Sequence, residues 1–91
     1  MPDEKLARAI RSSKRREILQ ILCEQNKVSV HEIADKLKIT ESSASRHLKL
    51  LFDLGFLEFE DKAREKFYSL KIKELKDFFE AYNNIVKKME Q

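Results

Sequence analysis

Val30–Leu57 has the sequence VHEIADKLKITESSASRHLKLLFDLGFL, which indicates two short helices joined by a tight turn. In its second half, polar and basic side chains recur at intervals of three and four residues, so they share one helical face. That face consists of Ser42, Ser45, Arg46 and Lys49, whereas Ala44, Leu48 and Leu51 point away from it. A helix with one polar, basic face and one apolar face is suited to enter a groove of nucleic acid.

Both predicted helices carry terminal signals. Ser29 is followed three residues later by Glu32, a capping box that predicts a helix over 30–37. Thr40 is suited to cap the second helix, which we expect to extend to about Leu54. Gly55, the only glycine of the chain, stands where a left-handed residue commonly ends a helix. The recognition helix is therefore predicted over about 40–54.

Two further helices are expected before this stretch. Leu6 and Ile10 share a face of a short helix predicted over about 3–11, with acidic residues in its first turn. Ser13 is expected to cap a second helix that runs to about Gln25, and Val28 is expected to pair briefly as a strand.

A hairpin and a long helix are predicted after the recognition helix. Phe56–Glu60 and Lys66–Leu70 alternate apolar and polar residues around the charged turn 61–65, DKARE, which lacks Gly and Asn. Over about 71–89, apolar residues recur in steps of three and four, as in a helix. These residues are Ile72, Leu75, Phe79, Tyr82, Val86 and Met89, with Phe78 and Ile85 widening the stripe.

Composition narrows the class of protein. The chain has 91 residues, of which 38% are charged and 42% are hydrophobic, so it is too apolar for a disordered chain and too charged for a membrane protein. Its first ten residues, MPDEKLARAI, lack the apolar segment of a signal peptide. The single cysteine, Cys23, cannot form an internal disulfide. We therefore expect one soluble, cytoplasmic domain, mainly α with a small β-hairpin.

The order of these elements, and several residues within them, resemble the winged-helix repressors of the ArsR type, which are small prokaryotic regulators. The resemblance covers about 12–70, and its most specific run is Ser43–Leu51, SASRHLKLL. Other matching residues are Glu32-Ile33-Ala34, Leu37, Ile39, Leu54-Gly55 and Phe67-Tyr68-Ser69-Leu70. The resemblance implies a winged helix-turn-helix fold and a single DNA-binding domain over 1–91.

Two features depart from the family pattern. Lys38 occupies the turn position where such motifs often have glycine, and a left-handed backbone there would cost on the order of 1 kcal/mol. Metal-sensing members often have a Cys-x-Cys pair where this chain has Ser29 and His31, or use the last helix, but residues 71–91 contain no histidine. The resemblance implies a regulator without the usual metal sites, and we expect no cofactor, no metal and no evident small-molecule effector.

The candidate DNA-binding residues lie on the recognition helix and on the wing, which we place at about 60–66. The fork of Arg46 can engage guanine in the major groove, and hydroxyl groups suit phosphate or base contacts. Lys62 and Arg64 can reach the DNA backbone or the minor groove, although acidic residues surround them. The candidate set is Thr40, Ser42, Ser43, Ser45, Arg46, Lys49, Lys62 and Arg64. We expect His47 to be packed and the basic triplet 14–16 to be a solvated helix face.

The apolar stripe of the last helix is wider than the core of a small domain needs. We expect the helices at about 3–11 and 71–89 to form a dimer interface, which would set two recognition helices roughly 34 Å apart and favour a palindromic operator. The expected interface residues are Leu6, Ile10, Leu75, Phe78, Phe79, Tyr82, Ile85, Val86 and Met89.

The leading hypothesis is a homodimeric, sequence-specific regulator of transcription that binds double-stranded DNA, with repression favoured. One alternative is a protein-interaction module in which the face around Phe78 and Phe79 binds a partner. Another is a metal-responsive sensor, whose ligands would come from separate helices. An enzyme is not expected, because no acid orients His47 in a triad and no glycine-rich phosphate loop occurs. The sequence leaves open the operator, the sign of regulation, any effector and a redox role for Cys23.

Overall fold

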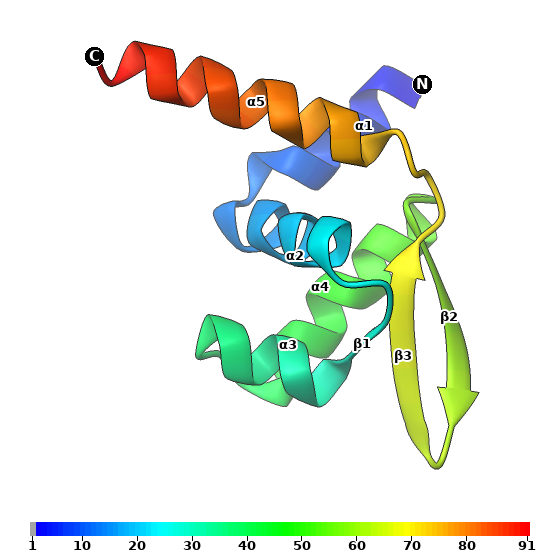
Figure 1. Ribbon diagram of the computed structural model, residues 1–91. Coiled ribbons are helices and arrows are strands. Elements are labelled where there is room, and N and C mark those ends of the chain that lie inside the picture. The colour runs from blue at the N-terminus through cyan, green and yellow to red at the C-terminus, as the bar shows by residue number, and fades with distance from the viewer. Residues whose placement is uncertain (1) are drawn as a thin grey trace.

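The computed structural model describes residues 2–91, which form a small winged helix-turn-helix fold. The elements are α1 (Pro2–Arg11), α2 (Ser13–Glu24), β1 (Val28–Ser29), α3 (Val30–Leu37), α4 (Glu41–Asp53), β2 (Leu57–Lys62), β3 (Glu65–Leu70) and α5 (Leu75–Met89). In Figure 1, α3, the start of α4 and the tip of the hairpin lie at the lower end, whereas α1 and α5 lie at the upper end. The predicted fold class, mainly α with a small β-hairpin, is confirmed.

The helix caps agree with the sequence at two of three positions. Ser29 and Glu32 form the complete capping box of α3, with both hydrogen bonds present. Thr40 caps α4, because its hydroxyl oxygen accepts a hydrogen bond from the backbone N–H of Ser43 at 3.0 Å. The expected cap of α2 is corrected: Ser12, not Ser13, has the extended backbone and accepts from the N–H of Arg15 at 3.3 Å. Two adjacent serines have the same capping chemistry, and only the backbone angles distinguish them.

The hairpin is longer than predicted. β2 and β3 pair antiparallel from Leu57 opposite Leu70 to Lys62 opposite Glu65. Only Ala63 and Arg64 remain as the turn, and both have positive φ, 53° and 69°. A two-residue turn with positive φ matches the twist of the strands, and the opposite charges of Lys62 and Glu65 face each other across it. The sequence signal was weak because this turn normally uses Asn or Gly.

The short strand predicted near Val28 is confirmed. β1 pairs antiparallel with β3, placing Val28 opposite Tyr68 and Ser29 opposite Phe67, so the sheet order is β1-β3-β2. The strand leads directly into α3 and ties the beginning of the helix-turn-helix to the hairpin. The wing and the recognition helix are therefore held in one framework.

The last helix begins later than expected, at Leu75 rather than about residue 71. The backbone N–H of Lys71 donates to the carbonyl of Phe56 at 2.9 Å, which extends the hairpin contact, and Ile72 then lies in a turn before the helix. Ile72 is therefore not part of the helical stripe. Leu75 and Phe79 pack into the core of the chain, where they are 4% and 2% exposed.

The core joins the inner faces of all five helices to one face of the sheet. Fully buried side chains from α2, α3, α4 and the strands form its centre, and they are Ile18, Leu19, Ile33, Leu48, Leu51, Leu57, Leu70 and Val28. The side chains of α4 that were predicted to point inward, Ala44, Leu48 and Leu51, are all 0% exposed. The opposite face of this helix is thereby turned outward.

Candidate nucleic-acid interface

The outward face of α4 contains the predicted stripe. The side chains of Ser42, Ser45, Arg46 and Lys49 are exposed, and Ser43 is half-buried. Thr40 is exposed, and although its hydroxyl oxygen accepts the capping hydrogen bond, its O–H group can still donate to another acceptor. The structure therefore brings together hydroxyl donors and two cations on one helix face.

The turn before α4 sets the angle of the recognition helix. Lys38 has left-handed backbone angles, φ 56° and ψ 47°, as expected for this position. The N–H groups of Lys38 and Ile39 both donate to the carbonyl of Ala34, in the latter case at 3.1 Å. A lysine replaces the glycine that favours this conformation, at a cost of about 1 kcal/mol. Its exposed side chain is free of the core.

Lys49 has a carboxylate neighbour on the same helix. Its Nζ lies 3.2 Å from Asp53, four residues later, and the Lys49 side chain is 75% exposed. An exposed pair of this kind contributes little to stability, so the ammonium group is available to a phosphate.

Lys66 is a cation of this surface that sequence reasoning missed. Lys66, Lys49 and Ser45 line an open groove between α4 and the hairpin, and Lys66 Nζ lies 4.4 Å from the centre of the Phe59 ring. Strand alternation could have indicated it, because residues 66, 68 and 70 share the face that packs on the helix.

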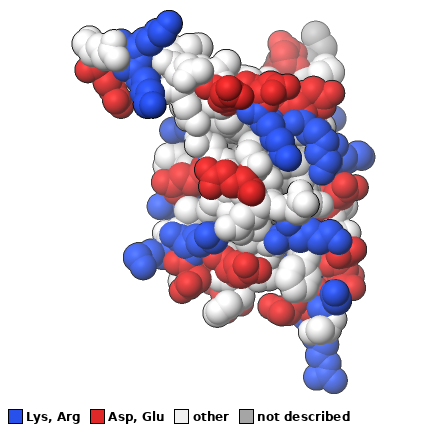
Figure 2. All heavy atoms as spheres, viewed as in Figure 1, with Lys and Arg blue, Asp and Glu red and all other residues white. Residues whose placement is uncertain are grey.

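The wing carries positive charge at its tip. Lys62 and Arg64 are exposed, and Figure 2 shows Lys and Arg atoms at the lower tip of the molecule, while both signs alternate over the rest of this face. Glu60 is paired with Lys27, at 2.6 Å between Nζ and Oε1. This pair removes one of the acidic neighbours from competition for the two cations of the wing.

Two residues of the basic triplet of α2, Arg15 and Arg16, have a structural role. The guanidinium of Arg15 donates to the carbonyls of Ala9 and Arg8, at 3.2 Å and 2.7 Å, and that of Arg16 donates to those of Ile10 and Arg11. These carbonyls belong to the last turn of α1, where cations are favoured. The two arginines therefore hold α1 against α2, and the expectation of a merely solvated face is corrected for them.

The two histidines occupy opposite electrostatic environments. His47 on α4 is half-buried, and burial together with the charges of Arg15 and Arg46 lowers its pKa. His31 on α3 is exposed, and its hydrogen bond with Glu41 raises its pKa. The ring of His47 is therefore neutral near pH 7, whereas that of His31 gains a proton more readily.

The upper end of the molecule leaves an apolar surface free. Because Leu75 and Phe79 belong to the core, the dimer expectation is corrected for these two residues. Leu6, Ile10, Phe78 and Tyr82 are half-buried, and Ile85, Val86 and Met89 are 59%, 40% and 79% exposed. The free apolar surface therefore lies mainly on the second half of α5.

Other kinds of site are not evident in the part of the chain described. Within residues 2–91, no three His, Cys, Asp or Glu side chains are grouped so that they could hold a metal ion. The same residues include no helix that is long and apolar enough to cross a membrane.

The fold and the site define the class of protein. A basic second helix after a tight turn, followed by an antiparallel hairpin, is a winged helix-turn-helix, in which the second helix is the one that enters the major groove. The chain matches the family model described as "Bacterial regulatory protein, arsR family" over residues 12–58. It is also 32% identical over 72 residues to the arsenical resistance operon repressor of Bacillus subtilis, an alignment covering 79% of this chain and 69% of that protein. The chain belongs to the ArsR family and is a DNA-binding regulator of transcription.

Solved structures agree with this assignment. HlyU from Vibrio cholerae is 30% identical, with a TM-score of 0.76 over 92% of this chain and 90% of that one. The winged helix-turn-helix DNA-binding domain Mb0332 from Mycobacterium bovis, described as homodimeric, is 18% identical. It superposes with a TM-score of 0.85 over 97% of this chain and 81% of that one. At that identity the second structure supports the fold alone.

Proposed function

We propose that this protein is a homodimeric repressor that binds a palindromic DNA operator through α4, with the wing on the DNA backbone or in the minor groove. The exposed stripe on α4 carries the proposal, because Ala44, Leu48 and Leu51 of the inner face are buried, whereas Ser42, Ser45, Arg46 and Lys49 of the outer face are exposed. Arg46 is assigned to a base edge, and Lys49 and the hydroxyl groups to phosphates or bases. Repression is supported by the similarity to the arsenical resistance operon repressor.

The dimer is proposed to form through α1 and the free half of α5. An apolar surface rimmed by polar residues marks an interaction site in a small soluble domain, and a two-fold interface uses the same patch on both copies. The proposed residues are Leu6, Ile10, Phe78, Tyr82, Ile85, Val86 and Met89. Because this surface lies at the end opposite the wing tip, a second copy can bind there while both recognition helices stay free (Figure 1).

The test is the affinity for a fluorescent, mixed-sequence duplex, followed by anisotropy at several salt concentrations. The double substitution Arg46→Ala, Lys49→Ala is expected to weaken binding by more than about 1 kcal/mol in total and to flatten the salt dependence. The matched control removes two exposed cations at the other end of the molecule, Lys71→Ala with Lys73→Ala, and is expected to bind nearly as the wild type. Undiminished affinity of the first variant would contradict the assignment. Absence of binding by the wild type at low salt would favour a protein-interaction module.

The wing gives a separate prediction. Replacing Lys62 and Arg64 by alanine is expected to weaken binding to all duplexes by a similar factor, because phosphate contacts carry no sequence information. The slope of log affinity against log salt is expected to fall by about 1 for each lost phosphate contact. Equal slopes for the variant and the wild type would place the wing outside the DNA interface.

A further inference from the structure

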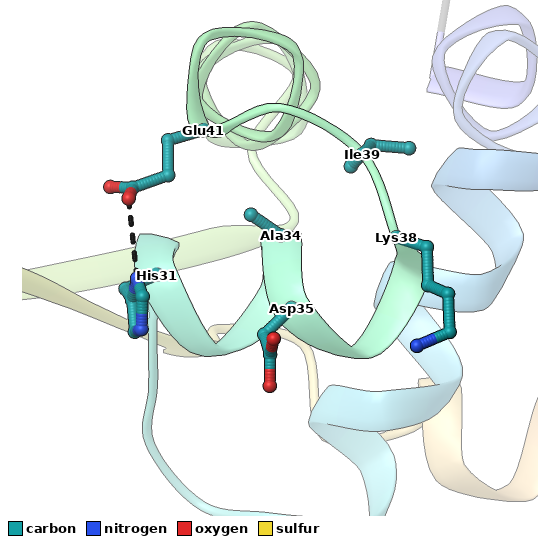
Figure 3. A pocket seen from close by; sticks show the side chains of 6 residues that line it. All are labelled: His31, Ala34, Asp35, Lys38, Ile39 and Glu41. Carbon is teal, nitrogen blue, oxygen red and sulfur yellow. Dashed lines mark hydrogen bonds and ion pairs between the residues drawn. The ribbon is translucent and has the colours of Figure 1, made fainter.

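His31 and Glu41 connect the two helices of the helix-turn-helix at the end that faces DNA in the proposed function. His31 is the second residue of α3, and Glu41 is the first residue of α4. His31 Nδ1 and Glu41 Oε2 lie 3.2 Å apart, and the two side chains are 69% and 64% exposed. Figure 3 shows the pair bridging one side of a shallow pocket formed between the helices.

Acidic groups from three elements act on the His31 ring. Glu41 of α4 forms the hydrogen bond, Asp35 lies on the next turn of α3, and Glu65 belongs to β3 of the hairpin. Together they raise the pKa of His31, and the main cause is the hydrogen bond that the carboxylate of Glu41 accepts from the ring. Lys38 lines the same pocket and appears in Figure 3 at the side away from His31. When His31 is neutral, its ring offsets none of the negative charge of these three carboxylates.

DNA approaches the same edge. In a helix-turn-helix, the first residues of the second helix reach base edges and the first helix crosses the phosphate backbone. Glu41 therefore brings a negative charge toward phosphates, which repel it, whereas a protonated His31 makes the pair neutral. Phosphates near the ring also favour its charged form, so the DNA-bound state holds the proton more tightly than the free protein does.

We propose that His31 is a further positioning residue of the DNA interface, which takes up a proton when DNA binds and thereby neutralises Glu41 at the start of the recognition helix. The inference rests on the proposed function, because it needs α4 to face DNA. The direction of the pH dependence follows from linkage, because the DNA-bound state carries more protons than the free protein. DNA affinity is therefore high at low pH and falls as the pH rises through and above the ordinary histidine pKa of about 6.5.

The test measures the affinity for a mixed-sequence duplex of about 30 base pairs, long enough for two half-sites one turn apart, between pH 6 and 8.5 at constant salt. Wild-type affinity is expected to fall over this range by up to about tenfold for each His31, and so by up to about a hundredfold for a dimer, since a pKa difference of one unit between the bound and the free protein corresponds to tenfold. Calorimetry in two buffers with different ionisation enthalpies counts the protons, and net uptake is expected near pH 7. His31→Gln is expected to lose this uptake and to bind with little pH dependence.

Two further variants distinguish charge from shape. His31→Arg keeps a positive charge at every pH and is expected to bind at pH 8 about as tightly as the wild type binds at pH 6. His47→Gln replaces the other histidine of the chain and is expected to keep the pH dependence, whatever its affinity. Wild-type binding with no proton uptake, or uptake that persists in His31→Gln, overturns the inference and leaves the proposed function intact. No binding of this duplex at any pH overturns both.

Discussion

Leu48→Ala is expected to destabilise the fold by about 2–5 kcal/mol, because it leaves a cavity in the centre of the core. Leu48 is 0% exposed on the inner face of α4, between the core residues Ala44 and Leu51. A domain of this size has a stability of about 5–14 kcal/mol, so the loss is a large fraction of the total. The measurement is the midpoint of urea unfolding, with all variants at one protein concentration because the proposed dimerisation would add to stability.

The matched control is Leu50→Ala on the same helix. Leu50 is half-buried, so its truncation to alanine removes less buried surface and leaves a smaller cavity. The loss in the free energy of unfolding is therefore expected to be clearly smaller than for Leu48→Ala. Because the recognition helix rests on Leu48, DNA affinity is expected to fall with stability in the first variant. Equal losses in the two variants would contradict the packing described for α4.

Ile85→Asp is expected to convert the proposed dimer to monomers. Complete burial of an isoleucine side chain contributes about 1.5–3 kcal/mol, but Ile85 is 59% exposed in the single chain, so a dimer adds only that part of the burial. A two-fold interface loses this contribution twice, so the dimer dissociation constant is expected to rise by more than about tenfold, before the cost of placing a carboxylate in an apolar interface is added. Sedimentation velocity over a range of concentrations measures the change directly. DNA affinity is expected to fall with it, because one recognition helix then binds alone.

The control places the same charge one residue away. Asn84 is exposed on the polar side of α5, and Asn84→Asp is expected to leave the dimer intact. If the wild type is monomeric at all concentrations, the proposed dimer is contradicted. The apolar second half of α5 would then be the expected binding surface for a different protein. A dimer that survives Ile85→Asp would place the interface elsewhere on the chain.

Short-range rules account for what the sequence predicted well. Capping depends on residues three positions apart, which is why Ser29 with Glu32 and Thr40 with Ser43 follow the expected pattern. Gly55 has the positive φ of 94° that its place after α4 predicted. The division of α4 into a buried and an exposed face likewise follows from helical periodicity alone.

Long-range contacts account for what it did not predict. The sequence predicted a turn within 61–65 but not its two residues, Ala63 and Arg64, whose positive φ accompanies the pairing of the two strands. The guanidinium groups of Arg15 and Arg16 bind carbonyls of a preceding helix whose direction is set by the core. Lys66 became part of the candidate site only in the structure, because its position beside α4 depends on how the hairpin packs against that helix.

The sequence by itself therefore determined the elements, the helix-turn-helix and the face of α4 that can meet DNA, because periodicity and capping act within a few residues. Only the tertiary structure decided how the long apolar stripe of α5 is divided. Leu75 and Phe79 became core while Ile85 and Met89 stayed free, since α5 crosses the body of the domain only along its first half. The tertiary structure also set His31 beside Glu41, because two residues ten apart in the chain meet only when the turn between their helices closes.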